Sequence, residues 1–335
     1  MKQVYLIFFL CLFVLLTDTG FAQTKGPTRM FRIYEDDDYF NIKGKGTDKA
    51  YSDGTRLDFI YEKKNKPRFF LERLMPHAGD SSKNMYGWSL MQIMATPNNI
   101  STTEYQPHDY RYAGALLAMH SLHSFNPERK YSFQTEVVAG VRGPASLAEP
   151  VQKGFHSMIN YQKPMGWDNQ LRTMPLVNIN FCAEKQFLSI GNWLEVNGGV
   201  QAAAGSFVDA FTIYPMIRIG RMSPYFDGYL NQFGSFQRRG KLVKTQYYFV
   251  FKPMANLVAY NALLQGKRRN ENDDKVDTNI DEPTENIRRL ASNVQFGAVV
   301  AHGNFGMAYT QTYSNSYIKG LYRHSVGNLT MSVRW

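Results

Sequence analysis

Hydrophobic and polar residues alternate with a period of two along many short segments of the chain. From 131 to 141 the odd positions are apolar, with Thr135 as the exception, and several even positions are polar. Similar alternation occurs at 55–61, 294–300 and 329–335. A period of two is typical of a β-strand with one apolar and one polar face. These segments predict an all-β protein.

The first 22 residues have the form of a secretory signal peptide. Lys2 precedes an apolar run from Val4 to Leu16, and the small residues Gly20 and Ala22 follow it. The run is too short to cross a bilayer, so we expect cleavage after Ala22 rather than the alternative, a membrane anchor. The mature chain would then be a single domain, residues 23–335.

Two classes of β-protein fit this chain, a soluble β-domain and a transmembrane antiparallel β-barrel. No segment after the signal approaches the length of a transmembrane helix, and 21 Tyr and 23 Phe suit either a packed core or the aromatic girdles of a barrel. The last predicted strand ends on an aromatic residue, Trp335. A final strand with an aromatic terminus resembles the assembly signal of outer-membrane barrels. With the secretory signal, this favours a barrel in the outer membrane. Cys182 is the only cysteine left after cleavage, so no internal disulfide can form.

The chain carries a formal net charge of +10 at pH 7. Such a charge can indicate nucleic-acid binding, but an exported barrel would not meet nucleic acid. We therefore assign the basic side chains to the phosphates of a glycolipid surface. The acidic run 270–277 lacks the Gly and the final Glu of an EF-hand loop, so we interpret it as a solvated loop.

A helical pattern interrupts the strands between Gly143 and Leu171. Ser146 and Glu149 have the spacing of a capping box, and Pro150 suits a first helical turn. This predicts a short helix near residues 147–160.

Gln152 and His156 lie four residues apart and therefore share one face of this helix. The apolar residues point towards the other face; they are Val151, Phe155, Met158 and Ile159. We expect the polar pair to face away from the apolar side, with His156 exposed to a cleft. A single histidine on a helix surface is more often structural than catalytic, so the pattern needs support from the rest of the chain.

That support comes from short motifs in a fixed order. They are Asp36–Phe40, Thr47–Asp48, Tyr51–Gly54, Thr96–Pro97, Asp109–Gly114 and the segment Gly143–Leu171. Over nearly all of the mature chain, this set resembles the outer-membrane lipid A deacylase family. The resemblance implies a monomeric barrel of twelve strands that depends on calcium and removes the 3′-linked acyloxyacyl group of lipid A. It places the family's Asn and Asp at Asp37 and Asp38 and its Thr at Ser52, whereas the family's catalytic lysine has no clear counterpart.

Ester hydrolysis needs a base that activates water and an electrophile that stabilises the oxyanion. His156 is the predicted general base, with Gln152 positioning water or substrate beside it. Asp38, together with Asp37, is predicted to bind calcium, because carboxylate oxygens favour a hard cation over zinc. Asp37 also belongs to the predicted catalytic set. Ser52 is predicted to be a hydrogen-bonding neighbour rather than a nucleophile, since no base is assigned to activate it.

The sequence thus predicts a calcium-dependent esterase that acts on lipid A, or lipopolysaccharide, in the outer membrane. The alternative is a non-enzymatic barrel of the same fold, either a channel or a structural protein. A catalytic site requires the polar residues to converge at one rim or wall, whereas a channel would spread charges around an open lumen.

Overall fold

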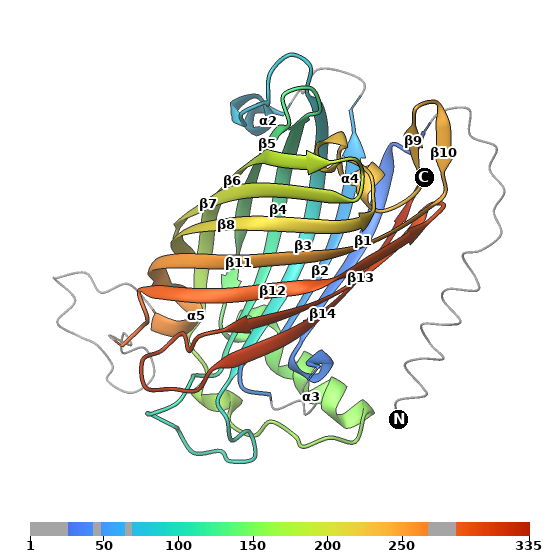
Figure 1. The fold of residues 1–335 in the computed structure, drawn as a ribbon. Helices are drawn as coiled ribbons and strands as arrows, with labels where there is room; N and C mark the ends of the chain where they lie inside the picture. Colours follow the sequence, from blue (N-terminus) through green and yellow to red (C-terminus); the bar gives the residue numbers. More distant parts are fainter. Residues whose placement is uncertain (1–25, 43–47, 64–68, 267–285) are drawn as a thin grey trace.

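The computed structural model describes residues 26–42, 48–63, 69–266 and 286–335. In this part of the chain twelve antiparallel strands close into one barrel (Figure 1). They are β1 (Arg29–Asp37), β2 (Ala50–Glu62), β3 (Lys83–Thr96), β4 (Ala113–Asn126), β5 (Tyr131–Arg142), β6 (Met174–Ile190), β7 (Leu194–Gly205), β8 (Val208–Arg221), β11 (Thr245–Asn261), β12 (Leu290–His302), β13 (Phe305–Ser314) and β14 (His324–Arg334). The barrel closes because β1 pairs with both β2 and β14. The predicted closed antiparallel barrel of twelve strands is confirmed.

The remaining elements are short. They are η1 (Asp38–Phe40), α2 (Phe70–Leu74), η2 (Pro144–Ser146), α3 (Ala148–Met158), η3 (Trp167–Asn169), η4 (Tyr225–Asp227), α4 (Tyr229–Gln232), α5 (Ala262–Gln265) and a hairpin of β9 (Phe236–Arg238) and β10 (Lys241–Val243). Among the described residues, no helix has the length and apolar character needed to cross a membrane. The predicted signal peptide, residues 1–22, and the acidic run 270–277 lie outside the described residues and stay predictions.

The polar positions of the strands point into the barrel. In the lumen, the Arg56 guanidinium lies 2.6 Å from the Glu136 carboxylate and 2.7 Å from that of Asp58. The guanidinium of Arg32 lies 2.7 Å from the second oxygen of Asp58. On the outer side, Leu57 and Phe59 of β2 are exposed. The alternation therefore has the meaning expected from the sequence, with apolar residues towards lipid and a polar, charge-paired interior.

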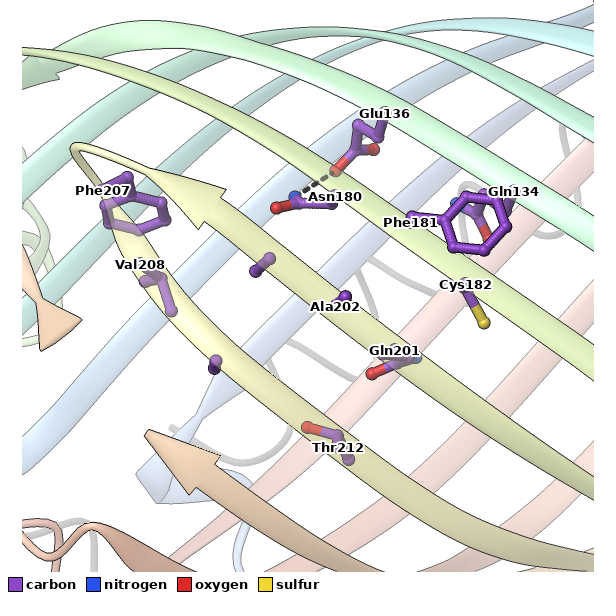
Figure 2. A pocket seen from close by; sticks show the side chains of 12 residues that line it. Gln134, Glu136, Asn180, Phe181, Cys182, Gln201, Ala202, Phe207, Val208 and Thr212 are labelled. Carbon is purple, nitrogen blue, oxygen red and sulfur yellow. Dashed lines mark hydrogen bonds between the residues drawn. The ribbon is translucent and has the colours of Figure 1, made fainter. Parts of the chain in front are cut away.

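A cavity of about 340 Å³ lies along β5 to β8 (Figure 2). Its polar lining includes Gln134, Glu136, Asn180 and Thr212, and the amide of Asn180 donates to Glu136 over 3.3 Å. Because the Glu136 charge is already paired with Arg56, this cavity does not present a ring of free charge.

The two ends of the barrel differ. One end carries the C-terminus, the short connections 127–130, 191–193 and 303–304, the connection with α2, and a segment with η4 and α4 that folds into the lumen and that we call the plug. There Phe226 and Leu230 pack against Met30 and Phe125 in one buried cluster. The other end carries η1, α3 and longer connections (Figure 1). Short turns face the periplasm and long loops face the outside in barrels of this kind, so we assign the end with α3 to the cell exterior.

The helix α3 confirms the predicted element but not its predicted cap. It begins at Ala148 after Leu147, whose backbone is left-handed with φ 59°, and no side chain caps it. The carboxylate of Glu149 lies 2.5 Å from the Lys153 ammonium one turn later. Ser146 accepts a long bond of 3.4 Å from the amide of Ala148. The capping box is therefore wrong, because Glu149 pairs with a cation at i+4 instead of turning back to the cap.

Candidate active site

The predicted site residues meet at the exterior end of β1, β2 and α3, on the outer wall of the barrel. Along β1, Met30 and Arg32 point into the lumen, where they contact the plug and Asp58. Side chains alternate along a strand, so Asp37 points to the other side, the outer wall. Asp53 of β2 lies directly opposite Asp37. The candidate site therefore faces the bilayer rather than the lumen.

His156 is held by a hydrogen bond on one ring nitrogen and faces a carboxylate with the other. Its Nδ1 lies 2.5 Å from the carbonyl oxygen of Gln162, and its Nε2 lies 3.5 Å from Oδ1 of Asp48. A carbonyl oxygen can only accept, so Nδ1 carries the hydrogen of the neutral ring. Nε2 is then the nitrogen that can take a proton. The Tyr161 ring packs edge-on against the imidazole, with the ring centroids 5.1 Å apart.

The neighbours of His156 make it a stronger base than a free imidazole. Burial alone lowers the pKa of His156, because it disfavours the charged ring. The bonds to Asp48 and to the Gln162 carbonyl, and the negative charges of Asp48 and Asp37, outweigh burial and raise the pKa above its ordinary value. The imidazolium formed by proton uptake is therefore stabilised within this site.

Ser52 lies behind Asp48 rather than beside the ring. Its Oγ is 2.5 Å from Oγ1 of Thr96, and the Thr96 hydroxyl donates to the backbone carbonyl of Asp48. Asp48 has a left-handed backbone, with φ 42°, which this bond helps to hold. Ser52 thus belongs to the hydrogen-bonded support of the residue that faces His156.

Gln152 holds the loop that follows the helix. Its Oε1 accepts a hydrogen bond of 2.9 Å from Nε1 of Trp167, which is fully buried and packs against Tyr112 with the ring centroids 5.0 Å apart. The side chain lies on the same helix face as His156, as predicted. Its carbonyl oxygen is already engaged, so the contact to Trp167 supports a positioning role more than a direct contact with water.

The orientation of α3 is opposite to the one expected from the sequence. Gln152 and His156 are buried against the barrel, whereas Val151, Phe155 and Met158 are 47%, 40% and 71% exposed. The prediction that His156 is exposed to a cleft is wrong. Next to a bilayer the apolar face of a surface helix can turn outward, because lipid rather than water surrounds it. The same turn of the helix places its polar residues on the protein side.

Three carboxylates gather beside this helix. Oxygens of Glu35, Asp37 and Asp53 lie within 4.8 Å of one another. Asp38 is buried in η1, where its Oδ2 lies 3.4 Å from the backbone nitrogen of Lys49. The structure therefore groups Asp37 with Glu35 and Asp53 and turns Asp38 towards the Lys49 backbone. A set of three carboxylate oxygens has the chemistry of a site for a hard divalent cation.

The comparisons with known proteins agree with this architecture. A family model described as "Outer membrane protein LpxR" matches residues 6–335. This chain belongs to the LpxR outer-membrane protein family. The family expected from the motifs and the location in the outer membrane are thereby confirmed.

Two solved structures of outer-membrane barrels are similar to this chain to different degrees. LpxR from Salmonella typhimurium has a TM-score of 0.71 and 16% sequence identity, and the match covers 91% of this chain and 100% of that one. The β-domain of the Bordetella autotransporter BrkA has a TM-score of 0.44 and 9% identity, with coverage of 93% and 99%. No curated protein sequence matches the chain.

Sequence reasoning missed two parts of the candidate site. Asp48 was part of a motif but had no assigned role, and the Gln162 carbonyl has no sequence signal at all. Glu35 and Asp53 were not assigned as ligands, although a signal existed. Glu35 and Asp37 share a face on β1, and a hairpin register that places Asp53 opposite Asp37 brings the three together.

Proposed function

We propose that this LpxR-family barrel is a carboxylic ester hydrolase that removes the 3′-linked acyloxyacyl chain of lipid A. The observation that carries the proposal is the position of His156. Its ring is held by the Gln162 carbonyl and faced by Asp48, under a helix with an apolar outer face. A buried, polarised base on the lipid-facing side of a barrel suits a substrate that lies in the outer leaflet.

The substrate would reach the site sideways, from within the bilayer. The acidic cluster lies on the outer wall, and the exposed Val151 and Phe155 of α3 offer contacts for acyl chains. A water-soluble ester would gain no binding energy from contact with these apolar side chains. The geometry therefore favours an acyl-chain ester at the membrane surface over a small soluble ester.

In the proposed reaction, Nε2 of His156 takes a proton from water while the water oxygen attacks the ester carbonyl carbon. The negative charge of Asp48 stabilises the imidazolium, and the bond from Nδ1 to the Gln162 carbonyl leaves Nε2 as the nitrogen that takes the proton. The imidazolium then gives the proton to the departing sugar oxygen as the acyl–oxygen bond breaks. The products are a free acyloxyacyl acid and a sugar hydroxyl.

Calcium is part of the proposal. Glu35, Asp37 and Asp53 would hold it, with Asp38 adjacent, because three close carboxylates on a lipid-facing wall repel one another unless a cation or a proton offsets their charge. When bound there, calcium supplies positive charge for the oxyanion of the tetrahedral intermediate. We further propose that the enzyme acts as a monomer on lipopolysaccharide.

Substitution of His156 tests the proposal. His156→Ala should lower turnover by about two to four orders of magnitude, the range usual for a lost general base. His156→Gln keeps a hydrogen-bonding side chain but cannot carry the proton, so it should be equally impaired. The assay is the release of fatty acid from purified lipid A by folded protein in detergent with calcium. The control is His108→Ala, an exposed histidine in the connection between β3 and β4.

The barrel of each variant should remain folded, which heat-modifiable migration on a gel reports. A folded His156→Ala protein that hydrolyses lipid A at the wild-type rate would remove His156 from the mechanism. Absence of hydrolysis in the wild-type protein as well would favour the non-enzymatic barrel.

A further inference from the structure

A basic cavity lies at the periplasmic end of the barrel, opposite to the candidate active site. It has a volume of about 390 Å³. Its lining consists of Arg221, Arg238, Arg239, Lys241, Leu242 and Val243. None of these lining residues is acidic, and within the described part of the chain none of the four cations forms an ion pair. The cavity therefore concentrates positive charge that no ion pair among the described residues compensates.

The position of Arg221 sets the depth of this cavity in the membrane. Arg221 is two residues beyond Ile219 on β8 and shares its lipid-facing side. It pairs across the strands with Tyr247, which is 56% exposed. Trp193, 54% exposed, lies beside it, since its carbonyl accepts the Gly220 amide over 2.8 Å. Exposed Tyr and Trp on the outside of a barrel mark the membrane interface, so Arg221 lies at the level of the lipid headgroups of the inner leaflet.

The other three cations are carried by a tight hairpin. Arg238 of β9 pairs with Lys241 of β10, and the two turn residues, Arg239 and Gly240, have φ 47° and 75°. Two successive positive φ values are typical of the type I′ turn, where Asn and Gly are the usual residues. The chain therefore has an arginine at a position that ordinarily takes Asn or Gly. The hairpin holds its charges in one place, which a long flexible loop would not do.

We propose that this cavity binds the phosphate headgroup of an anionic glycerophospholipid from the inner leaflet. Guanidinium groups donate paired hydrogen bonds to phosphate oxygens, and the cavity volume is in the range of small-molecule sites. Leu242 in the lining and the exposed Ile219 below the rim provide apolar contacts for the acyl chains. Lipid A lies in the opposite leaflet, so this site is independent of the proposed hydrolase activity.

Native mass spectrometry of the full-length folded protein, released from detergent, can count bound lipid. Phosphatidylglycerol should bind more tightly than zwitterionic phosphatidylethanolamine with the same acyl chains. The triple variant Arg238→Gln, Arg239→Gln, Lys241→Gln should weaken phosphatidylglycerol binding by roughly a hundredfold, since each basic side chain at an anionic surface contributes a factor of about five. Arg221→Gln alone, which leaves the hairpin intact, should weaken it about fivefold.

The control removes three positive charges at the same end of the barrel but on β3 and the connection between β4 and β5. It is the triple variant Lys83→Gln, Arg129→Gln, Lys130→Gln, and it should bind phosphatidylglycerol as the wild type does. Equal losses in both triple variants would overturn the proposal, because binding would then depend on net charge alone. Equal binding of the two lipids, or displacement of phosphatidylglycerol by inorganic phosphate at the same concentration, would overturn it as well. In the last case the cavity would be a site for free anions.

Discussion

The contact between Asp48 and His156 leads to a quantitative prediction for Asp48→Asn. This change keeps the size of the side chain and removes its negative charge. Two opposite unit charges 3.5 Å apart attract by about 5 kcal/mol at an effective dielectric constant of about 20. The amide oxygen of the substituted side chain can still accept a hydrogen bond from the imidazolium, so we expect a smaller loss, on the order of 3 kcal/mol of transition-state stabilisation. That corresponds to about a hundredfold in turnover.

The pH dependence should change in a defined direction. The contacts of His156 raise its pKa above the ordinary value, so in the wild type the ring gains a proton, and activity falls, at a higher pH than for a free imidazole. Without the charge of Asp48 the pKa of His156 falls. The acidic limb of the profile should therefore move to lower pH in Asp48→Asn, while the plateau is lower.

The assay is fatty-acid release from lipid A measured across the pH range, with saturating calcium. Asp168→Asn is the matched control, because Asp168 is exposed in η3 and the change is chemically the same. An Asp48→Asn protein with wild-type turnover and an unmoved acidic limb would refute the reasoning. A loss of turnover with an unchanged acidic limb of the pH profile would mean that Asp48 contributes to catalysis in some way other than by stabilising the protonated ring of His156.

Three further predictions concern the metal, the helix and the barrel. Chelation should abolish hydrolysis and calcium should restore it better than zinc, while Asp37→Ala, which removes a carboxylate of the cluster, should act like chelation; full activity in excess chelator would exclude the metal. Gln152→Leu leaves the buried indole N–H of Trp167 without its hydrogen-bond acceptor, so it should destabilise α3 by about 1–3 kcal/mol. The amide hydrogens of α3 should then exchange faster in Gln152→Leu than in the control Gln162→Leu. The protein should show heat-modifiable migration and resist protease; recovery as a soluble periplasmic species would contradict a membrane barrel.

The barrel was predictable because each strand carries its own evidence. In β5, Ser132 and Glu136 alternate with apolar residues, and the lumen and the bilayer impose opposite polarity on the two faces. No local pattern, however, predicts the plug that places Phe226 against Met30 and Phe125 inside the periplasmic end. Those contacts join segments far apart in sequence, and a short apolar run is equally compatible with a strand.

The site was predictable only in part. The spacing of Gln152 and His156 correctly predicts that the two side chains share one face of the helix. The spacing does not predict whether that face packs against the barrel or is exposed. The orientation was wrong because the usual rule, with polar residues outward, assumes water around the helix. The Asp48 contact depends on a loop conformation, and the Gln162 carbonyl belongs to the backbone, so neither leaves a trace in residue type.

The orientation of α3 resolves a conflict that any hydrolase of membrane lipids must meet. Charged side chains on the lipid face of a barrel are unfavourable, yet the chemistry needs carboxylates and a basic histidine beside a lipid ester. With its polar residues turned to the wall, α3 shields His156 and Asp48 from the acyl chains, and its outer side presents Val151 and Phe155 to the bilayer. Covering the site in this way also keeps its dielectric constant low, which strengthens the interaction of Asp48 with the imidazolium. The same helix that makes a polar site tolerable on the outer wall thus also strengthens the proposed base, His156.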